Sequence, residues 1–216
     1  MLATSRRLPA AERSLRKGSW EGKEIASTGA LQCGLGGVLL VLGFGTIGGY
    51  VAQVGKALGM TVLGQRRSVS EVMTTPEGFE MHPPGKEALH ALLPRCSHLV
   101  ITCPLTEETR GLIGAEELAL LPSPAVVVNV GRAEVIAEDA MWAALQEDGG
   151  TRLGFGSDVW WSESSPNKRG APGNEPAGGA DEEGVPPVFP SQYPMHERDN
   201  VRPPVPPVPP PVLETL

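Results

Sequence analysis

The chain has 216 residues, of which 40% are hydrophobic, which suffices for one domain of ordinary size but not for two large ones. Its formal net charge is -7 and it contains no long basic run, so neither a nucleic acid nor an anionic membrane is expected as the main partner. The longest apolar run, 38–42, is far shorter than the ~20 residues that a membrane span needs.

The first twenty residues are basic, a composition that also occurs in organelle transit peptides. Leu8 and Leu15, with the stretch 10–13 between them, suit instead a short surface helix leading to Gly18, and we prefer this interpretation. The three cysteines fit no paired metal or redox spacing, so we expect reduced thiols and no metal site. The expected compartment is therefore the cytoplasm, with an organelle as the alternative.

Short apolar runs alternate with helical segments over most of the chain. Strands are expected at 37–42, 60–64, 98–103, 125–129 and 153–159. Helices are expected at 46–58, 86–93, 115–121 and 138–147. This alternation predicts an α/β fold of the Rossmann type, a doubly wound parallel sheet with crossover helices.

The C-terminal part has a different composition. Beyond Trp161 the periodicity stops, and 166–194 is a loop rich in glycine, proline and acids. From Val201 onward the prolines predict an extended polyproline segment or a disordered tail. We divide the chain into a linking helix and lead-in (1–30), a Rossmann domain that binds NAD(P) (31–161), a loop with a remnant of the last strand (162–200), and a Pro-rich tail (201–216).

The assignment of a dinucleotide to this domain depends on a glycine-rich turn between the first strand and the first long helix. The turn reads Gly43-Phe44-Gly45-Thr46-Ile47-Gly48. Gly43 would allow a tight turn, Gly45 would let the backbone approach a pyrophosphate, and Gly48 would let the helix pack on the strand. Free N–H groups and the helix dipole would then face the anion. The alternative is a turn that is merely structural.

The second strand leads into Gly64-Gln65-Arg66-Arg67-Ser68, where a site for NAD would carry an acid for the ribose hydroxyls. No carboxylate is present. The guanidinium groups of Arg66 and Arg67 and the hydroxyl of Ser68 suit a ribose 2′-phosphate, so we favour NADP over NAD. Alternatively, both arginines are solvated surface charges.

Further motifs follow in a fixed order. They are Cys103-Pro104-Leu105-Thr106 through Thr109-Arg110-Gly111-Leu112-Ile113, then Asn129-Val130-Gly131-Arg132, then Asp158-Val159-Trp160. Together with the glycine-rich turn, they resemble the D-isomer-specific 2-hydroxyacid dehydrogenases, which include glyoxylate/hydroxypyruvate reductases and phosphoglycerate dehydrogenases. The resemblance covers roughly 8–201 and is far more specific than one glycine motif.

The resemblance implies a role for each motif. The turn at Cys103, Pro104 and Thr109 would lie along the nicotinamide ribose, Asp158 would hold the carboxamide, and Val130 and Gly131 would also contact the cofactor. Arg132 would clamp the carboxylate of a small 2-keto or 2-hydroxy acid and stabilise negative charge on its carbonyl. Glu163 would raise the pKa of a partner histidine, the proton donor. The family also implies a possible homodimer.

The sequence departs from the family at several points. The histidine expected after a strand near Val201 is missing, since the chain continues Arg202-Pro203, and His196 precedes that strand. Ala133 stands where the family usually has glycine, and the family's separate substrate domain is expected to be absent. We therefore expect an NAD(P)-dependent oxidoreductase in a truncated or alternatively spliced form. The alternatives are a regulatory dinucleotide-binding module without catalysis, and a Pro-rich tail that docks into an SH3- or WW-type groove.

Overall fold

The computed structural model describes residues 1–19, 37–161, 191–195 and 201–202. Eight strands form one sheet in the order β3-β4-β2-β1-β5-β6-β7-β8, and every pair of neighbours is parallel except β3 and β4. The expected doubly wound, Rossmann-type sheet is confirmed. The strands are β1 Val38–Leu42, β2 Thr61–Gln65, β3 Met73–Thr74, β4 Glu80–His82, β5 His98–Ile101, β6 Ala125–Asn129, β7 Leu153–Ser157 and β8 Val201–Arg202.

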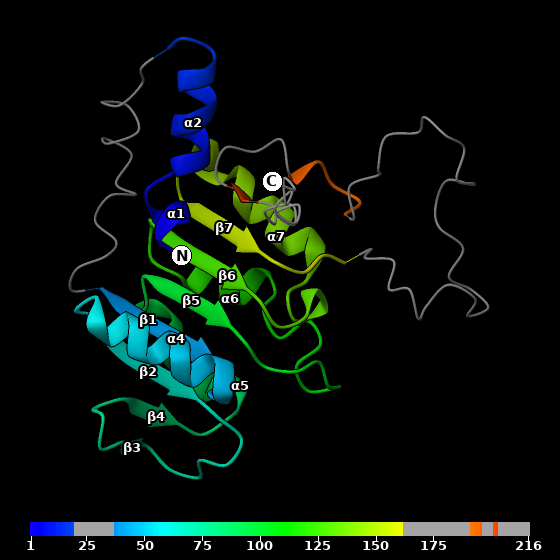
Figure 1. Ribbon diagram of the computed structural model, residues 1–216. Coiled ribbons are helices and arrows are strands. Elements are labelled where there is room, and N and C mark those ends of the chain that lie inside the picture. Colours follow the sequence, from blue (N-terminus) through cyan, green and yellow to red (C-terminus); the bar gives the residue numbers. More distant parts are fainter. Residues whose placement is uncertain (20–36, 162–190, 196–200, 203–216) are drawn as a thin grey trace, which may run out of the picture.

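Helices cover both faces of the sheet. One face carries α4 (Thr46–Ala57), and the other carries α5 (Lys86–Leu92), α6 (Ala115–Leu120) and α7 (Glu138–Gln146) (Figure 1). The short helix expected near the N-terminus is confirmed as α2 (Leu8–Arg16), and a further turn of helix, α1 (Leu2–Ser5), precedes it. No helix in the described part of the chain is both long and apolar enough to cross a bilayer.

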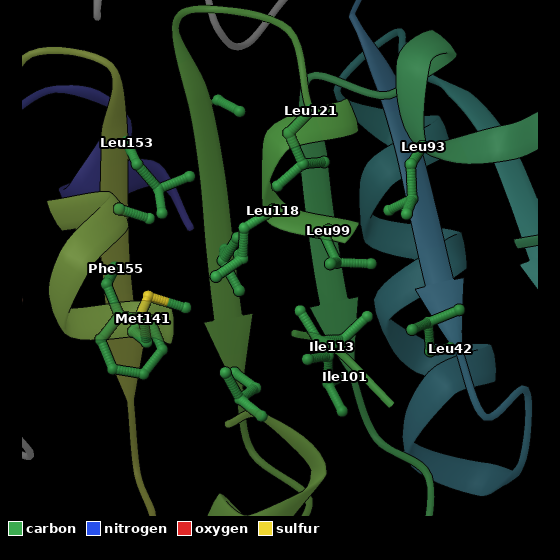
Figure 2. Close-up of a cluster of buried hydrophobic side chains, with 14 of the residues drawn as sticks. Leu42, Leu93, Leu99, Ile101, Ile113, Leu118, Leu121, Met141, Leu153 and Phe155 are labelled. Atoms are coloured by element: carbon green, nitrogen blue, oxygen red, sulfur yellow. The ribbon is translucent and has the colours of Figure 1, made fainter. Parts of the chain in front are cut away.

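Each central strand is buried on both sides, because successive side chains point to opposite faces of the sheet. Leu40 and Leu42 of β1 belong to the larger hydrophobic cluster, under α5, α6 and α7, whereas Leu39 and Val41 belong to the smaller cluster with α4. Figure 2 shows the larger cluster, to which Leu153 and Phe155 of β7 and Met141 of α7 belong. At about 1.5–3 kcal/mol for each large side chain that is fully buried, these two layers dominate the stability of the domain.

The N-terminal helix α1 packs on β7 because β7 carries glycines on that face. A Cβ atom on Gly154 would lie 2.8 Å from Cγ2 of Thr4, and one on Gly156 would lie 3.2 Å from its Oγ1. Beside this contact, Ser5 Oγ lies 3.0 Å from Nε2 of His98, a side chain that is 1% exposed. Burial, together with the nearby N-terminal amine, lowers the pKa of His98 to about 4.

Two short stretches from the C-terminal part also join the fold. Ser191 Oγ donates a hydrogen bond to Glu138 Oε1 (2.6 Å), and the ring of Tyr193 stacks on Trp142 at 5.3 Å. Met195 is completely buried in the larger cluster. Val201 and Arg202 form β8, which pairs with β7, while the rest of the expected Pro-rich tail lies outside the described residues.

Candidate functional site

The strand order places a topological switch point at the carboxyl ends of β1 and β5, where open parallel sheets leave a crevice. The chain runs from β1 to β2 on one side and returns to β5 on the other, so the direction of winding reverses between β1 and β5. In open parallel sheets, ligands bind at such a switch point. Gly43 directly follows β1 and Thr102 directly follows β5, so the glycine-rich turn lies at this point.

A different structural feature explains why glycine stands at each of the three positions of the turn. Gly43 has a φ of +90°, and a Cβ atom there would lie 2.5 Å from the Cα and N atoms of Cys103. A Cβ atom on Gly48 would lie 2.4 Å from the carbonyl oxygen of Gly43 and 3.1 Å from Cγ1 of Val41. Nothing lies within 4 Å of a Cβ atom on Gly45. Gly43 and Gly48 are therefore required by packing, whereas the space at Gly45 is open to a ligand.

The first turn of α4 presents unused backbone donors to this open space. Gly45 is the N-cap residue, with no side-chain capping hydrogen bond, and the first helical hydrogen bond runs from Gly49 N to Gly45 O (2.8 Å). The N–H groups of Thr46, Ile47 and Gly48 therefore have no acceptor within the described ranges. A helix of 12 residues adds its dipole, so an anion is favoured here.

The end of β2 lies next to the glycine-rich turn. The carbonyl oxygen of Gln65 accepts hydrogen bonds from Gly43 N (3.1 Å) and Phe44 N (3.3 Å). The side-chain Nε2 of Gln65 donates to the carbonyl oxygens of Pro83 (2.9 Å) and Gly85 (3.3 Å), which fixes the loop after β4. The three residues that follow β2 are exposed, and no ion pair involves them in the described part of the chain: Arg66, Arg67 and Ser68.

Three turns interlock at the backbone of Cys103. Gly43 approaches this backbone from the β1 side, as described above, and a Cβ atom on Gly131, after β6, would lie 2.7 Å from the carbonyl oxygen of Cys103. Cys103 itself is 8% exposed, and burial raises the pKa of its thiol. We call Gly43, Cys103 and Gly131 the three-turn interlock, because no side chain fits at either glycine without moving Cys103.

The segment after Cys103 is held by its own hydroxyl groups. Thr109 Oγ1 donates to the carbonyl oxygen of Pro104 (2.8 Å) and accepts from Thr106 N (2.8 Å). Farther on, Gly111 N donates to the carbonyl oxygen of Glu134 (2.8 Å), so the loop is anchored to the turn that follows Arg132. The turn attributed to the nicotinamide ribose is thus rigid, and Thr109 acts on it through Pro104.

The structure brings Arg132 and Asp158 to the same edge of the sheet. Arg132 is exposed, three residues after β6, and its Nη1 donates to the carbonyl oxygen of Gly131 (2.8 Å). Ala133 is buried at 2% exposure, so its methyl group is accommodated. Asp158 follows β7 and is exposed. Glu163 and His196 lie outside the described residues.

The described histidines are each engaged in another contact. His98 lies at the amino end of β5, at the opposite edge of the sheet from the crevice. Nε2 of His82 lies 2.7 Å from Oε1 of Glu80, a carboxyl whose pKa is lowered to about 2, chiefly by hydrogen bonds from Arg95. Nε2 of His90 lies 2.7 Å from Oε1 of Glu117.

His90 also belongs to a group with possible metal ligands, namely His90, Glu116 and Glu117. The ammonium of Lys86 lies 2.9 Å from Glu116 Oε2 and 3.3 Å from Glu117 Oε1. Glu117 Oε2 also accepts from Gly114 N (3.0 Å), as part of the cap of α6. Both carboxylates therefore already pair with one protein cation, and the group is an ion-pair network.

Two polar side chains to which the sequence assigned no role organise the site. Thr102 Oγ1 donates to the carbonyl oxygen of Gly43 (2.6 Å), and Asn129 bonds to the backbone of the turn that follows it. The available signal was their position, since each is a polar residue at the carboxyl end of an apolar strand.

Comparison with known proteins relates both the sequence and the fold to one group of enzymes. The family model for "D-isomer specific 2-hydroxyacid dehydrogenase, NAD binding domain" matches residues 1–176. A glyoxylate reductase of Thermococcus gammatolerans is 36% identical over 166 residues, which are 76% of this chain and 48% of that protein. A D-3-phosphoglycerate dehydrogenase of Methanocaldococcus jannaschii is 33% identical over 147 residues, 68% of this chain and 26% of that protein.

A solved structure gives the same result. The D-isomer specific 2-hydroxyacid dehydrogenase of Xanthobacter autotrophicus, in complex with NADPH and MES, has a TM-score of 0.62 and 29% identity, over 94% of this chain and 68% of that one. The chain spans half or less of the length of the two curated relatives described above.

Proposed function

The chain belongs to the D-isomer-specific 2-hydroxyacid dehydrogenase family, of which it carries the NAD-binding domain, and on this premise we propose that its switch-point crevice binds NADP or NAD. The diphosphate would lie at the first turn of α4. The adenosine half would lie toward β2, and the nicotinamide half would lie along the turns after β5, β6 and β7. The single observation that carries this proposal is the set of unused N–H groups of Thr46, Ile47 and Gly48, which open onto free space at Gly45.

We further propose that the chain prefers NADPH to NADH. The turn after β2 offers Arg66, Arg67 and Ser68, all exposed, and no carboxylate in the position where one would bind the two ribose hydroxyls of NAD. A 2′-phosphate would meet two guanidinium groups without ion-pair partners among the described residues, whereas an acid would repel it. The relative from Xanthobacter autotrophicus was solved with NADPH, which is consistent with this preference.

The proposed reaction is the interconversion of a small 2-keto acid and its 2-hydroxy acid. The cofactor supplies or accepts the hydride. Arg132, exposed at the crevice edge, would bind the substrate carboxylate and stabilise the charge that develops on the carbonyl oxygen. Asp158 would orient the carboxamide of the nicotinamide, and Glu163 would act on a histidine that donates the proton.

A second candidate is a dinucleotide-binding module without turnover. The observation that favours it is that His82, His90 and His98 are each engaged elsewhere, so no described histidine is available as the proton donor. A chain of this kind would bind the cofactor with the same residues and would lack the last step of catalysis.

We also propose that the chain forms a homodimer through α4 in a cytoplasmic, reducing setting. Three large side chains on α4 are exposed, namely Ile47 (57%), Tyr50 (67%) and Val54 (55%), and an apolar stripe of this kind suits an interface. The thiols of Cys96 and Cys103 are unpaired, which suits a reducing compartment. Sedimentation of the purified chain tests the dimer, and a Tyr50→Lys variant is expected to sediment as the monomer.

Calorimetric titration with NADPH and NADH tests the main proposal. The chain should bind both, with NADPH tighter by about tenfold or more, since a charge-assisted pair contributes about 1.5–3 kcal/mol. A variant with both Arg66→Ala and Arg67→Ala should lose the preference but keep NADH binding. No binding of either dinucleotide would refute the proposal, and turnover of glyoxylate with NADPH would decide between the enzyme and the module.

A further inference from the structure

Asn129, at the end of β6, is a completely buried polar residue whose side chain bonds to the turn that follows it. Its Oδ1 accepts a hydrogen bond from Gly131 N (3.0 Å), and its Nδ2 donates one to the carbonyl oxygen of Arg132 (2.9 Å). The two bonds hold the turn from both ends. They also satisfy the polar ends of a side chain that is 0% exposed, which burial would otherwise penalise.

The backbone of Asn129 connects the same turn to the one after β7. Its carbonyl oxygen accepts from Asp158 N (3.1 Å) and from Ser157 Oγ (3.4 Å). One residue therefore contacts the segments that present Arg132 and Asp158. Through Gly131 it also acts on Cys103, because Gly131 packs against the Cys103 carbonyl in the three-turn interlock.

An amide is the side chain that this position requires. The group must accept from an N–H at one end and donate to a carbonyl at the other, which a carboxylate cannot do because it has no donor. An Asp would instead place a negative oxygen against the Arg132 carbonyl, and an Ala would leave both backbone groups without their partners. Asn129→Asp keeps nearly the same side-chain shape, but it replaces the donor to the Arg132 carbonyl with an acceptor.

We propose that Asn129 is the positioning residue for the nicotinamide half of the cofactor site, an inference that rests on the proposed function. Its side-chain amide sets the turn of Gly131 and Arg132 and, through Gly131, keeps Cys103 in place, while its backbone carbonyl bonds to Asp158 N. The adenosine half is held by other bonds, from Gly43 N to Gln65 O (3.1 Å) and from Gly49 N to Gly45 O (2.8 Å). Loss of the Asn129 amide should therefore disturb one half of the site and spare the other.

The experiment compares two ligands that differ at the nicotinamide. NADPH carries the ring, and 2′-phospho-ADP-ribose carries the rest of the molecule without it. Dissociation constants are measured by calorimetry, and the fluorescence of the reduced nicotinamide is measured at saturating NADPH. The variants are Asn129→Asp, Asn129→Ala as its uncharged counterpart, and Gln146→Glu, which makes the same change from amide to acid on an exposed part of α7.

In the wild-type chain and in Gln146→Glu, we expect the nicotinamide emission to change on binding. In both Asn129 variants, this change should be lost and the dissociation constant for NADPH should rise by about tenfold, while that for 2′-phospho-ADP-ribose stays within about twofold. Retained binding of 2′-phospho-ADP-ribose also shows that the variants are folded.

Other outcomes overturn the inference in distinguishable ways. If both variants show the same nicotinamide emission and the same NADPH affinity as the wild-type chain, the amide does not position the ring. The same conclusion follows if the nicotinamide emission of the wild-type chain does not change on binding. If a variant loses binding of both ligands and also loses the cooperative melting transition, Asn129 has a general structural role. If the wild-type chain binds neither ligand, the proposed function itself fails, and the inference fails with it.

Discussion

Replacement of Gly45 by alanine should separate cofactor binding from stability. The backbone there is extended (φ -96°, ψ -153°), a conformation that alanine adopts, and an added Cβ atom meets nothing within 4 Å. The lower entropy of the unfolded alanine chain favours folding by about 0.4–1 kcal/mol. Alanine is a poorer N-cap residue than glycine by a similar amount, so we expect the free energy of unfolding to change by less than about 0.5 kcal/mol.

Binding should change much more. The methyl group would occupy part of the open space beside the unused N–H groups of Thr46 and Ile47. It would hold the diphosphate oxygens farther from these nitrogens than the ~3.2 Å limit of a good hydrogen bond. Loss of one charge-assisted hydrogen bond weakens the free energy of binding by about 1.5–3 kcal/mol, so the dissociation constant for NADPH should rise by about 10- to 100-fold.

Calorimetric titration measures the affinity of Gly45→Ala, and urea denaturation measures its stability. Gly43→Ala is the matched control, since its side chain would have φ +90° and would lie 2.5 Å from the Cys103 backbone. This control should lose about 2–4 kcal/mol of stability, from left-handed strain and overpacking together. A Gly45→Ala chain that binds NADPH as tightly as the wild type would refute a diphosphate at the first turn of α4.

Three further predictions concern contacts around the sheet. Since the pKa of His98 falls from 6.5 when unfolded to about 4 when folded, the unfolded chain binds more protons, and stability should fall by up to about 3 kcal/mol as the pH drops from 6.5 to 4. Urea denaturation of His98→Gln over this range should show a smaller pH dependence, and an unchanged slope would contradict the assignment. Thr102→Val removes the donor to the Gly43 carbonyl and should lower the free energy of unfolding by about 1 kcal/mol, whereas a wild-type midpoint in urea would show that this bond contributes nothing. Gly154→Ala should cost about 1–3 kcal/mol because its Cβ atom would meet Thr4, and most of this loss should disappear in a Thr4→Ala background; additive losses in thermal melts would place the strain elsewhere.

The fold was largely predictable because its main strands are continuous apolar runs. Runs such as 38–42 and 125–129 are buried on both faces, so their composition alone distinguishes them from the amphipathic helices. β3 and β4 were missed because two and three residues are too few to show a period, and both residues of β3 are exposed. The docking of Met195 in the core was missed for a different reason, since it depends on packing against segments far away in the sequence.

The part of the candidate site that could be predicted consists of residues whose type alone indicates their role, namely glycines in tight turns and charged side chains. Gly43 and Gly48 could be assigned from spacing, because left-handed φ and close packing both exclude a side chain. Asn129 and Thr102 could not, since a buried amide or hydroxyl reveals its role only through the backbone groups it contacts. The roles of Arg132 and Asp158 came from the family resemblance, and the structure adds that both lie at the crevice edge.

The packing of Gly43 and Gly131 against one peptide limits how this protein can be re-engineered. A Cβ atom at either glycine would clash with the backbone of Cys103, so a side chain at Gly43 or at Gly131 requires this peptide to move. The exposed stretch 66–68 takes no part in that contact. Exchange of one dinucleotide for the other is therefore best attempted at 66–68, where new side chains project into solvent and the shared peptide stays undisturbed.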